Sequence, residues 1–88
     1  MNKTKSRSPK MSQREFGKRA MDYWLPKIQQ QLPPERAHDI VAINVETGEF
    51  EIGDSAMSVI ESFKQRWPDQ LFFLVRVDGG AVYRFRGM

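Results

Sequence analysis

The sequence predicts one small α+β domain with the element order α-β-β-α-β-β. Two stretches, residues 40–52 and 71–86, alternate apolar and polar residues on either side of a glycine-containing turn. Residues 55–67, which lie between them, place apolar residues at helical spacing, and residues 12–31 contain a second helical pattern. A chain of 88 residues has room for a single domain, which we place at residues 12–88.

A basic segment, residues 1–11, precedes this domain. Its cations are Lys3, Lys5, Arg7 and Lys10. Residues 1–19 carry seven basic residues against one acid, a net charge of +6, whereas the rest of the chain carries seven against ten, a net charge of −3. We expect a flexible arm that is a solvated tail, a contact for nucleic acid or an acidic partner, or a targeting segment. Translation from Met11 is an alternative to Met1.

The first predicted helix covers about residues 12–31. Ser12 and Glu15 have the spacing of a capping box. Apolar residues follow near helical spacing at Phe16, Ala20, Tyr23 or Trp24, Ile28 and Leu32. Pro26 lacks a backbone donor and its ring clashes with the carbonyl four residues earlier, so we expect a kink or a break there.

The first hairpin is predicted from the alternation on either side of a Thr-Gly pair. Pairing Val45 with Phe50 and Ile43 with Ile52 puts these four side chains on one face, with a loop of two or four residues between the strands. A register shifted by one residue would bury a glutamate. The opposite face then carries Asn44, Glu46, Glu49 and Glu51.

The second predicted helix, residues 55–67, has the clearest signature. Asp54 or Ser55 caps its start, and Pro68 ends it. The core-facing stripe consists of Ala56, Ile60, Phe63 and Trp67.

The second hairpin is predicted to turn at Asp78-Gly79-Gly80. A three-residue loop pairs Val77 with Ala81, Val75 with Tyr83 and Phe73 with Phe85, and we expect helix 55–67 to pack on this face of a four-stranded sheet. The opposite face carries Phe72, Leu74, Arg76, Val82, Arg84 and Arg86. Strand 71–77 is thus apolar on both sides, as in a central strand. Either the first helix or a second protomer could cover Phe72 and Leu74.

The residue types give no catalytic or metal-binding constellation. The chain has no cysteine and a single histidine, His38, whose neighbour Asp39 would point to the opposite face of a strand. Glu46, Glu49 and Glu51 are interpreted as a solvated hairpin face. We therefore expect no enzymatic activity, no cofactor and no bound metal.

The hydropathy pattern predicts a cytoplasmic protein. The longest apolar run, residues 71–75, is far shorter than the roughly 20 residues that span a bilayer. No apolar segment of the signal-peptide kind follows the N-terminus.

Charge arrangement is the remaining functional signal. Six acids and no Lys or Arg occur from Asp39 to Glu61, whereas Arg76, Arg84 and Arg86 share a face of the last hairpin. These arginines could bridge the glutamates or be solvated, could pair two copies of the chain, or could bind single-stranded nucleic acid. The candidate contact residues are Phe72, Leu74, Arg76, Arg84, Arg86, Lys3, Lys5, Arg7 and Lys10.

Residues 40–87 contain several specific short motifs. They are Val41-Ala42-Ile43, Glu46-Thr47-Gly48, Glu51-Ile52-Gly53-Asp54, Pro68-Asp69 and Val75-Arg76-Val77. In these motifs the chain resembles a family of short uncharacterised bacterial proteins, abundant in cyanobacteria. The resemblance implies a compact domain of strand-strand-helix-strand order and brings no catalytic residue. Genes of this kind often stand beside an aspartic-protease-like or toxin-like reading frame, which implies a two-protein unit. The chain departs from the family in its N-terminal helix and arm, and in having Asp-Gly-Gly where Gly-x-Pro is common.

The sequence thus predicts a non-enzymatic interaction module, antitoxin-like or an accessory subunit, that binds a protein partner or forms a homodimer. An exposed strand edge at residues 82–86 or 40–45 would offer backbone pairing to that partner. The alternative is nucleic-acid binding through the arm and the face of Arg76, Arg84 and Arg86.

Overall fold

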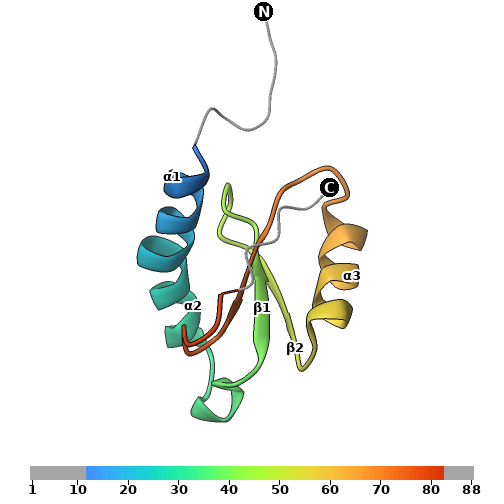
Figure 1. Ribbon diagram of the computed structural model, residues 1–88. Helices are drawn as coiled ribbons and strands as arrows, with labels where there is room; N and C mark the ends of the chain where they lie inside the picture. Colours follow the sequence, from blue (N-terminus) through green and yellow to red (C-terminus); the bar gives the residue numbers. More distant parts are fainter. Residues whose placement is uncertain (1–11, 83–88) are drawn as a thin grey trace, which may run out of the picture.

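The structure is a computed structural model that describes residues 12–82. Its elements are α1 (Gln13–Lys18), the π-helix η1 (Arg19–Trp24), α2 (Leu25–Gln31), the 3-10 helix η2 (Pro34–Arg36), β1 (Ile40–Ile43), β2 (Phe50–Gly53), α3 (Ala56–Arg66) and β3 (Phe73–Arg76). The run from α1 through α2 is continuous and is called the N-terminal helix below. This helix lies on one side of the sheet and α3 lies on the other (Figure 1). The predicted α+β class is confirmed.

The N-terminal helix begins as predicted and passes Pro26 without a break. The Ser12 hydroxyl accepts a hydrogen bond from the Glu15 N–H at 3.1 Å. Immediately before Pro26 the chain is π-helical, and the Leu25 N–H donates to the Ala20 carbonyl five residues back. A wider turn changes the position of the carbonyls that the proline ring would otherwise meet. The expected break is thus absent, and a π-helical segment precedes Pro26.

The sheet has the order β2-β1-β3, and both outer strands run antiparallel to β1. The central strand is therefore β1, whereas the sequence favoured the strand at 71–77. Alternating side chains of β1 enter opposite clusters, Val41 and Ile43 on one side and Ala42 on the other. Phe72 and Phe73 are both buried as well, so the prediction that this segment is covered on both faces is confirmed.

The first hairpin keeps its predicted face but has a different register. Ile43 pairs with Phe50, and Val41 pairs with Ile52, a shift of two residues from the predicted pairs. The shift follows from Asn44, whose carbonyl accepts hydrogen bonds from the turn and whose N–H donates to the Glu49 carbonyl at 2.8 Å. A shift of two leaves every side chain on its original face because the period of a strand is two.

The second hairpin turns one residue earlier than predicted. Val75 forms a bridge with Val82, not with Tyr83, and the Arg76 N–H donates to the Ala81 carbonyl at 2.8 Å. The turn spans residues 77–80, one residue more than predicted, and within it the Asp78 carboxylate accepts a hydrogen bond from the Gly80 N–H at 2.8 Å. The rest of the predicted fourth strand, residues 83–86, and the arm at residues 1–11 lie outside the described residues, so the four-stranded sheet stays a prediction.

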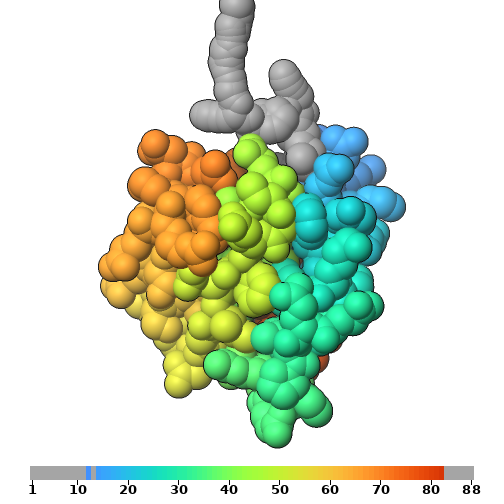
Figure 2. Space-filling view, turned by 180° about the vertical axis from the view of Figure 1, so that it is seen from behind, coloured from blue at the N-terminus to red at the C-terminus, as the bar shows by residue number. Residues whose placement is uncertain are grey.

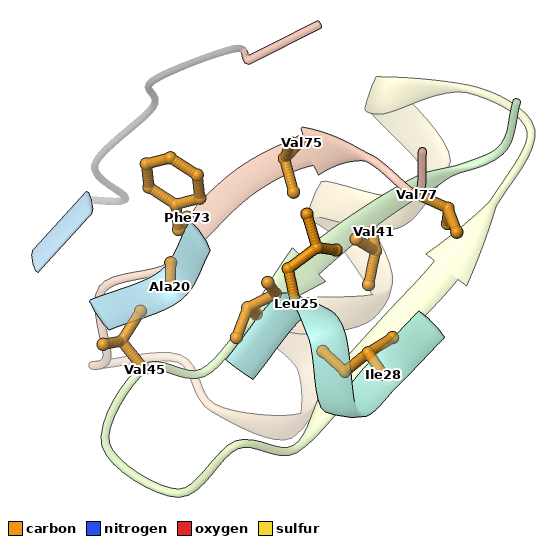
Figure 3. Packing of buried hydrophobic residues seen from close by; sticks show 9 residues of the cluster. Ala20, Leu25, Ile28, Val41, Val45, Phe73, Val75 and Val77 are labelled. Carbon is orange, nitrogen blue, oxygen red and sulfur yellow. The ribbon is translucent and has the colours of Figure 1, made fainter. Parts of the chain in front are cut away.

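Two hydrophobic clusters lie on the two faces of the sheet. The larger cluster joins the N-terminal helix to all three strands, and Figure 3 shows Leu25 and Ile28 of the helix among strand residues that include Val41 and Val75. In the smaller cluster, Val59 and Phe63 of α3 cover Ala42, Phe72 and Leu74. Helix 55–67 therefore covers the face opposite to the one we expected, because alternation groups side chains by face but does not say which helix covers each face.

No helix within residues 12–82 is both long and apolar enough to cross a membrane.

Candidate interaction surface

The two apolar residues of the predicted contact surface are not at the surface. Phe72 is 2% exposed and Leu74 is fully buried, and both pack beneath α3. The Phe63 and Phe72 rings lie 5.1 Å apart between centroids. The interpretation that places these two residues in a contact surface is therefore wrong, and neither a second protomer nor the N-terminal helix is needed to cover them.

Arg76 is the one predicted contact arginine among the described residues. Its Nε donates to the Asp78 carboxylate at 2.8 Å, and the side chain is about one-third exposed. This hydrogen bond and the one from the Gly80 N–H hold the pKa of Asp78 below its usual range. The Arg76 side chain, at the end of β3, therefore contacts the turn that follows. Arg84, Arg86, Lys3, Lys5, Arg7 and Lys10 lie outside the described residues.

Arg66, at the end of α3, contacts the glutamates of the first hairpin. Its guanidinium lies 2.5 Å from the Glu51 carboxylate and 4.0 Å from that of Glu49, and it stacks over the Trp67 ring at 4.3 Å. The sequence indicated that an arginine could bridge these acids but favoured those of the last hairpin. The available signal was the position of Arg66 in the last helical turn before Pro68.

The remaining polar candidates from the sequence are either exposed to solvent or form hydrogen bonds and ion pairs within the fold. His38 is exposed, with its Nε2 4.0 Å from the Asp78 carboxylate, and Asp39 pairs with Arg36. Asn44 is the buried polar residue of the described chain, at 1% exposure. Its amide donates to Gln70 at 2.6 Å and accepts from the Glu46 N–H at 3.1 Å.

No group of three or more His, Cys, Asp or Glu residues within positions 12–82 is placed to hold a metal ion.

The outer edge of β2 has unpaired backbone groups. In an antiparallel pair of strands, residue pairs that exchange backbone hydrogen bonds alternate with residue pairs that do not. The hydrogen bond from Asn44 to Glu49 makes Glu49 and Glu51 the bonded positions of this strand. Phe50 and Ile52 fall between them, so their N–H and C=O groups point away from β1. No described strand pairs with this side of β2.

The other edge of the sheet is occupied by the chain that follows β3. The Arg76 N–H, which points away from β1, donates to Ala81, and Val75 bridges to Val82. In Figure 2 the hairpin that contains β2, yellow-green to yellow, lies at the surface between the N-terminal helix and α3. The predicted edge at residues 40–45 is wrong, since β1 has a strand on both sides.

Acidic residues surround the open edge. Residues 44–54 contain Glu46, Glu49, Glu51 and Asp54 and no Lys or Arg. Glu46 and Asp54 are exposed, and Glu51 is about one-fifth exposed where Arg66 covers it. Among the described residues, Arg66 is the cation that contacts this group. The edge therefore combines outward backbone groups with a net negative charge.

A scan against models of known protein families, a search of curated proteins and a search of solved structures each found no match. The family resemblance drawn from the sequence therefore stays a prediction.

Proposed function

We propose that this protein is a non-catalytic interaction module, of the antitoxin or accessory-subunit kind, that binds a protein partner by adding an extended segment of the partner to β2. The observation that carries the proposal is the open side of β2, where Phe50 and Ile52 direct their N–H and C=O groups outward. Strand addition uses such groups for affinity and neighbouring side chains for specificity.

The contacts around β2 support this role because they hold the edge in place from both sides. The Trp24 indole N–H donates to the Val45 carbonyl at 2.7 Å and ties the β1–β2 turn to the N-terminal helix. Arg66 ties Glu51 to α3. A partner would therefore meet a preformed edge, which lowers the entropic cost of binding.

The test compares two variants at Ile52 in the full chain. Ile52→Pro removes the outward N–H without removing a bond to β1, since proline is tolerated where the N–H faces out of the sheet. Ile52→Ala loses the same side chain but keeps the N–H. Each variant is used to capture partners from an extract of the native cell, with nuclease added. We expect the native chain and Ile52→Ala to retain the same partner and Ile52→Pro to lose it.

A second readout on the native chain covers the case in which Ile52→Pro does not fold. Partner binding should slow hydrogen exchange at the Phe50 and Ile52 amides and leave the Glu51 amide unchanged, since that amide already bonds to β1. Strand addition would be contradicted if Ile52→Pro still captured the partner and if partner binding left the exchange of the Phe50 and Ile52 amides unchanged.

Nucleic-acid binding is the second candidate function, and the charge of the chain ends favours it. Residues 1–11 and 83–88 contain six basic residues and no acid. Arg14, Lys18 and Arg19 are exposed on the first turns of the N-terminal helix, which continue from the arm. This function predicts affinity for DNA or RNA that falls steeply with added salt and falls again when residues 1–10 are deleted. Absence of retention at low salt would rule it out.

A further inference from the structure

The acidic edge of β2 has a matching basic pattern at the N-terminus of the same chain. Glu49 and Glu51 are two residues apart, and both contact Arg66 of α3, so they share the α3 side of the hairpin. Lys3, Lys5 and Arg7 are also two residues apart, with Thr4 and Ser6 between them. Alternate residues of an extended segment lie on one face, so these three cations would share one side of a strand.

The charge at the edge exceeds what the described fold neutralises. Four acids lie in residues 44–54, and Arg66 is the one described cation in contact with them. The same excess disfavours a second copy as the occupant, because two antiparallel β2 edges would bring like charges opposite each other. A basic extended segment would instead place opposite charges in cross-strand pairs.

We propose that residues 2–8 pair with the outer edge of β2 in the same molecule, as an additional antiparallel strand with Lys3, Lys5 and Arg7 on the side of Glu49 and Glu51. The N-terminal helix starts at the end of the molecule where the β1–β2 turn lies (Figure 1). Because β2 runs away from that end, a segment that pairs with β2 and then continues into Ser12 would be antiparallel to it. Residues 8–11 span roughly 13 Å when extended and form the connection to Ser12.

This inference rests on the proposed function, because the arm covers the edge that the partner would use. Its consequence is competition: a partner segment has to displace residues 2–8 before it can pair with Phe50 and Ile52. The arm also shields an edge strand that could otherwise pair with any extended chain.

The test measures amide hydrogen exchange by NMR in the full chain without a partner. One variant, Lys3→Gln, Lys5→Gln and Arg7→Gln, removes the three cations. A matched control, Lys3→Thr, Thr4→Ser and Ser6→Lys, keeps the composition and net charge of the arm but makes its cations consecutive. We expect the Phe50 and Ile52 amides to exchange at least about tenfold more slowly in the native chain than in the Gln variant. The rearranged arm keeps two of its three cations on the shared face, so its exchange rates should be intermediate. The Glu51 amide, bonded to β1, should be the same in all three.

Equal exchange at Phe50 and Ile52 in all three proteins would overturn the inference. Protection that disappears on dilution would also overturn it, because the arm would then come from a second copy. Equal binding of a single-stranded oligonucleotide by the native and the rearranged arm, without any difference at these amides, would assign the arm to nucleic acid. None of these results would affect a finding that partner capture depends on the Ile52 N–H. The proposed function and the pairing of the arm can therefore fail independently of each other.

Discussion

The indole ring of Trp24 lies directly against the backbone of Gly48, at the turn between β1 and β2. A Cβ atom at Gly48 would come within 2.7 Å of three carbons of this ring. The indole N–H of the same side chain donates to the Val45 carbonyl. One residue of the N-terminal helix therefore fixes both the position and the conformation of a turn more than 20 positions later in the chain.

Gly48→Ala should destabilise the protein strongly. Gly48 has φ +84°, a conformation that a residue with a Cβ adopts at a cost, and the new methyl group would displace Trp24. The two effects together should lower the free energy of unfolding by about 2–4 kcal/mol, as measured by urea denaturation. A change below about 0.5 kcal/mol would mean that Trp24 does not pack on this turn in solution.

Gly17→Ala is the contrasting prediction, because Gly17 lies within α1 and needs no special conformation. A Cβ at Gly17 would meet the Phe73 ring at 3.4 Å, an ordinary contact distance. Alanine has the higher helix propensity, so the free energy of unfolding should rise by about 0.5–1 kcal/mol. Thermal and urea denaturation check the sign. A loss of stability would show that the N-terminal helix packs more tightly on β3 than this contact distance indicates.

Asn44→Ala should destabilise the first hairpin at its turn. The buried Asn44 amide links Gln70 to the Glu46 N–H, and alanine would leave both groups without this partner. We expect the free energy of unfolding to fall by about 1–3 kcal/mol. Gln70→Ala is the matched comparison and should cost less, since Gln70 is only partly buried and Asn44 keeps its bond to Glu46. Equal costs for the two variants would contradict this assignment.

The turn after β3 should contribute a pH-dependent term to stability. Hydrogen bonds from Arg76 and from the Gly80 N–H lower the pKa of Asp78 in the folded state below the 3.8 of a free aspartate. The sign of the effect follows from this lowered pKa: the contribution is fully present above the unfolded pKa and disappears as the pH falls through the folded pKa.

Asp78→Asn removes this term. The difference in unfolding free energy between the native chain and Asp78→Asn should therefore be constant near neutral pH and should shrink under strongly acidic conditions. Denaturation series at several pH values measure it. A difference that grows as the pH falls would have the wrong sign for this explanation.

Local patterns in the sequence predicted the helices and the faces of the first hairpin, but Val82 lies opposite Val75 and not on the predicted face with Leu74. Ser12 and Ser55 cap the helices as their spacing indicated, and Val41, Ile43, Phe50 and Ile52 share one face of the first hairpin. Such features depend on neighbours a few residues away, which the sequence displays directly. The register of the hairpin was wrong by two residues because the Asn44 backbone closes the turn through its hydrogen bonds to Glu49, Thr47 and Gly48.

The arrangement of layers and of the candidate site depended on distant contacts. The sequence did not indicate which helix covers Leu74, or that Arg66 would reach Glu51 in place of the arginines of the last hairpin. The open side of β2 follows from β1 being central, which in turn follows from the pairing of β1 with β3. Alternation within a strand carries no information on such pairings.

The larger hydrophobic cluster has a consequence for biosynthesis. It joins Ala20, Leu25 and Ile28 to Phe73, Val75 and Val77, so the N-terminal helix has to wait for β3 before it can complete the burial of its apolar side. Contacts of such sequence separation slow folding, and an unfinished chain exposes the helix to aggregation or to chaperones. A chain that stops before residue 73 would lack this strand, so this domain should fold only after β3 has been synthesised.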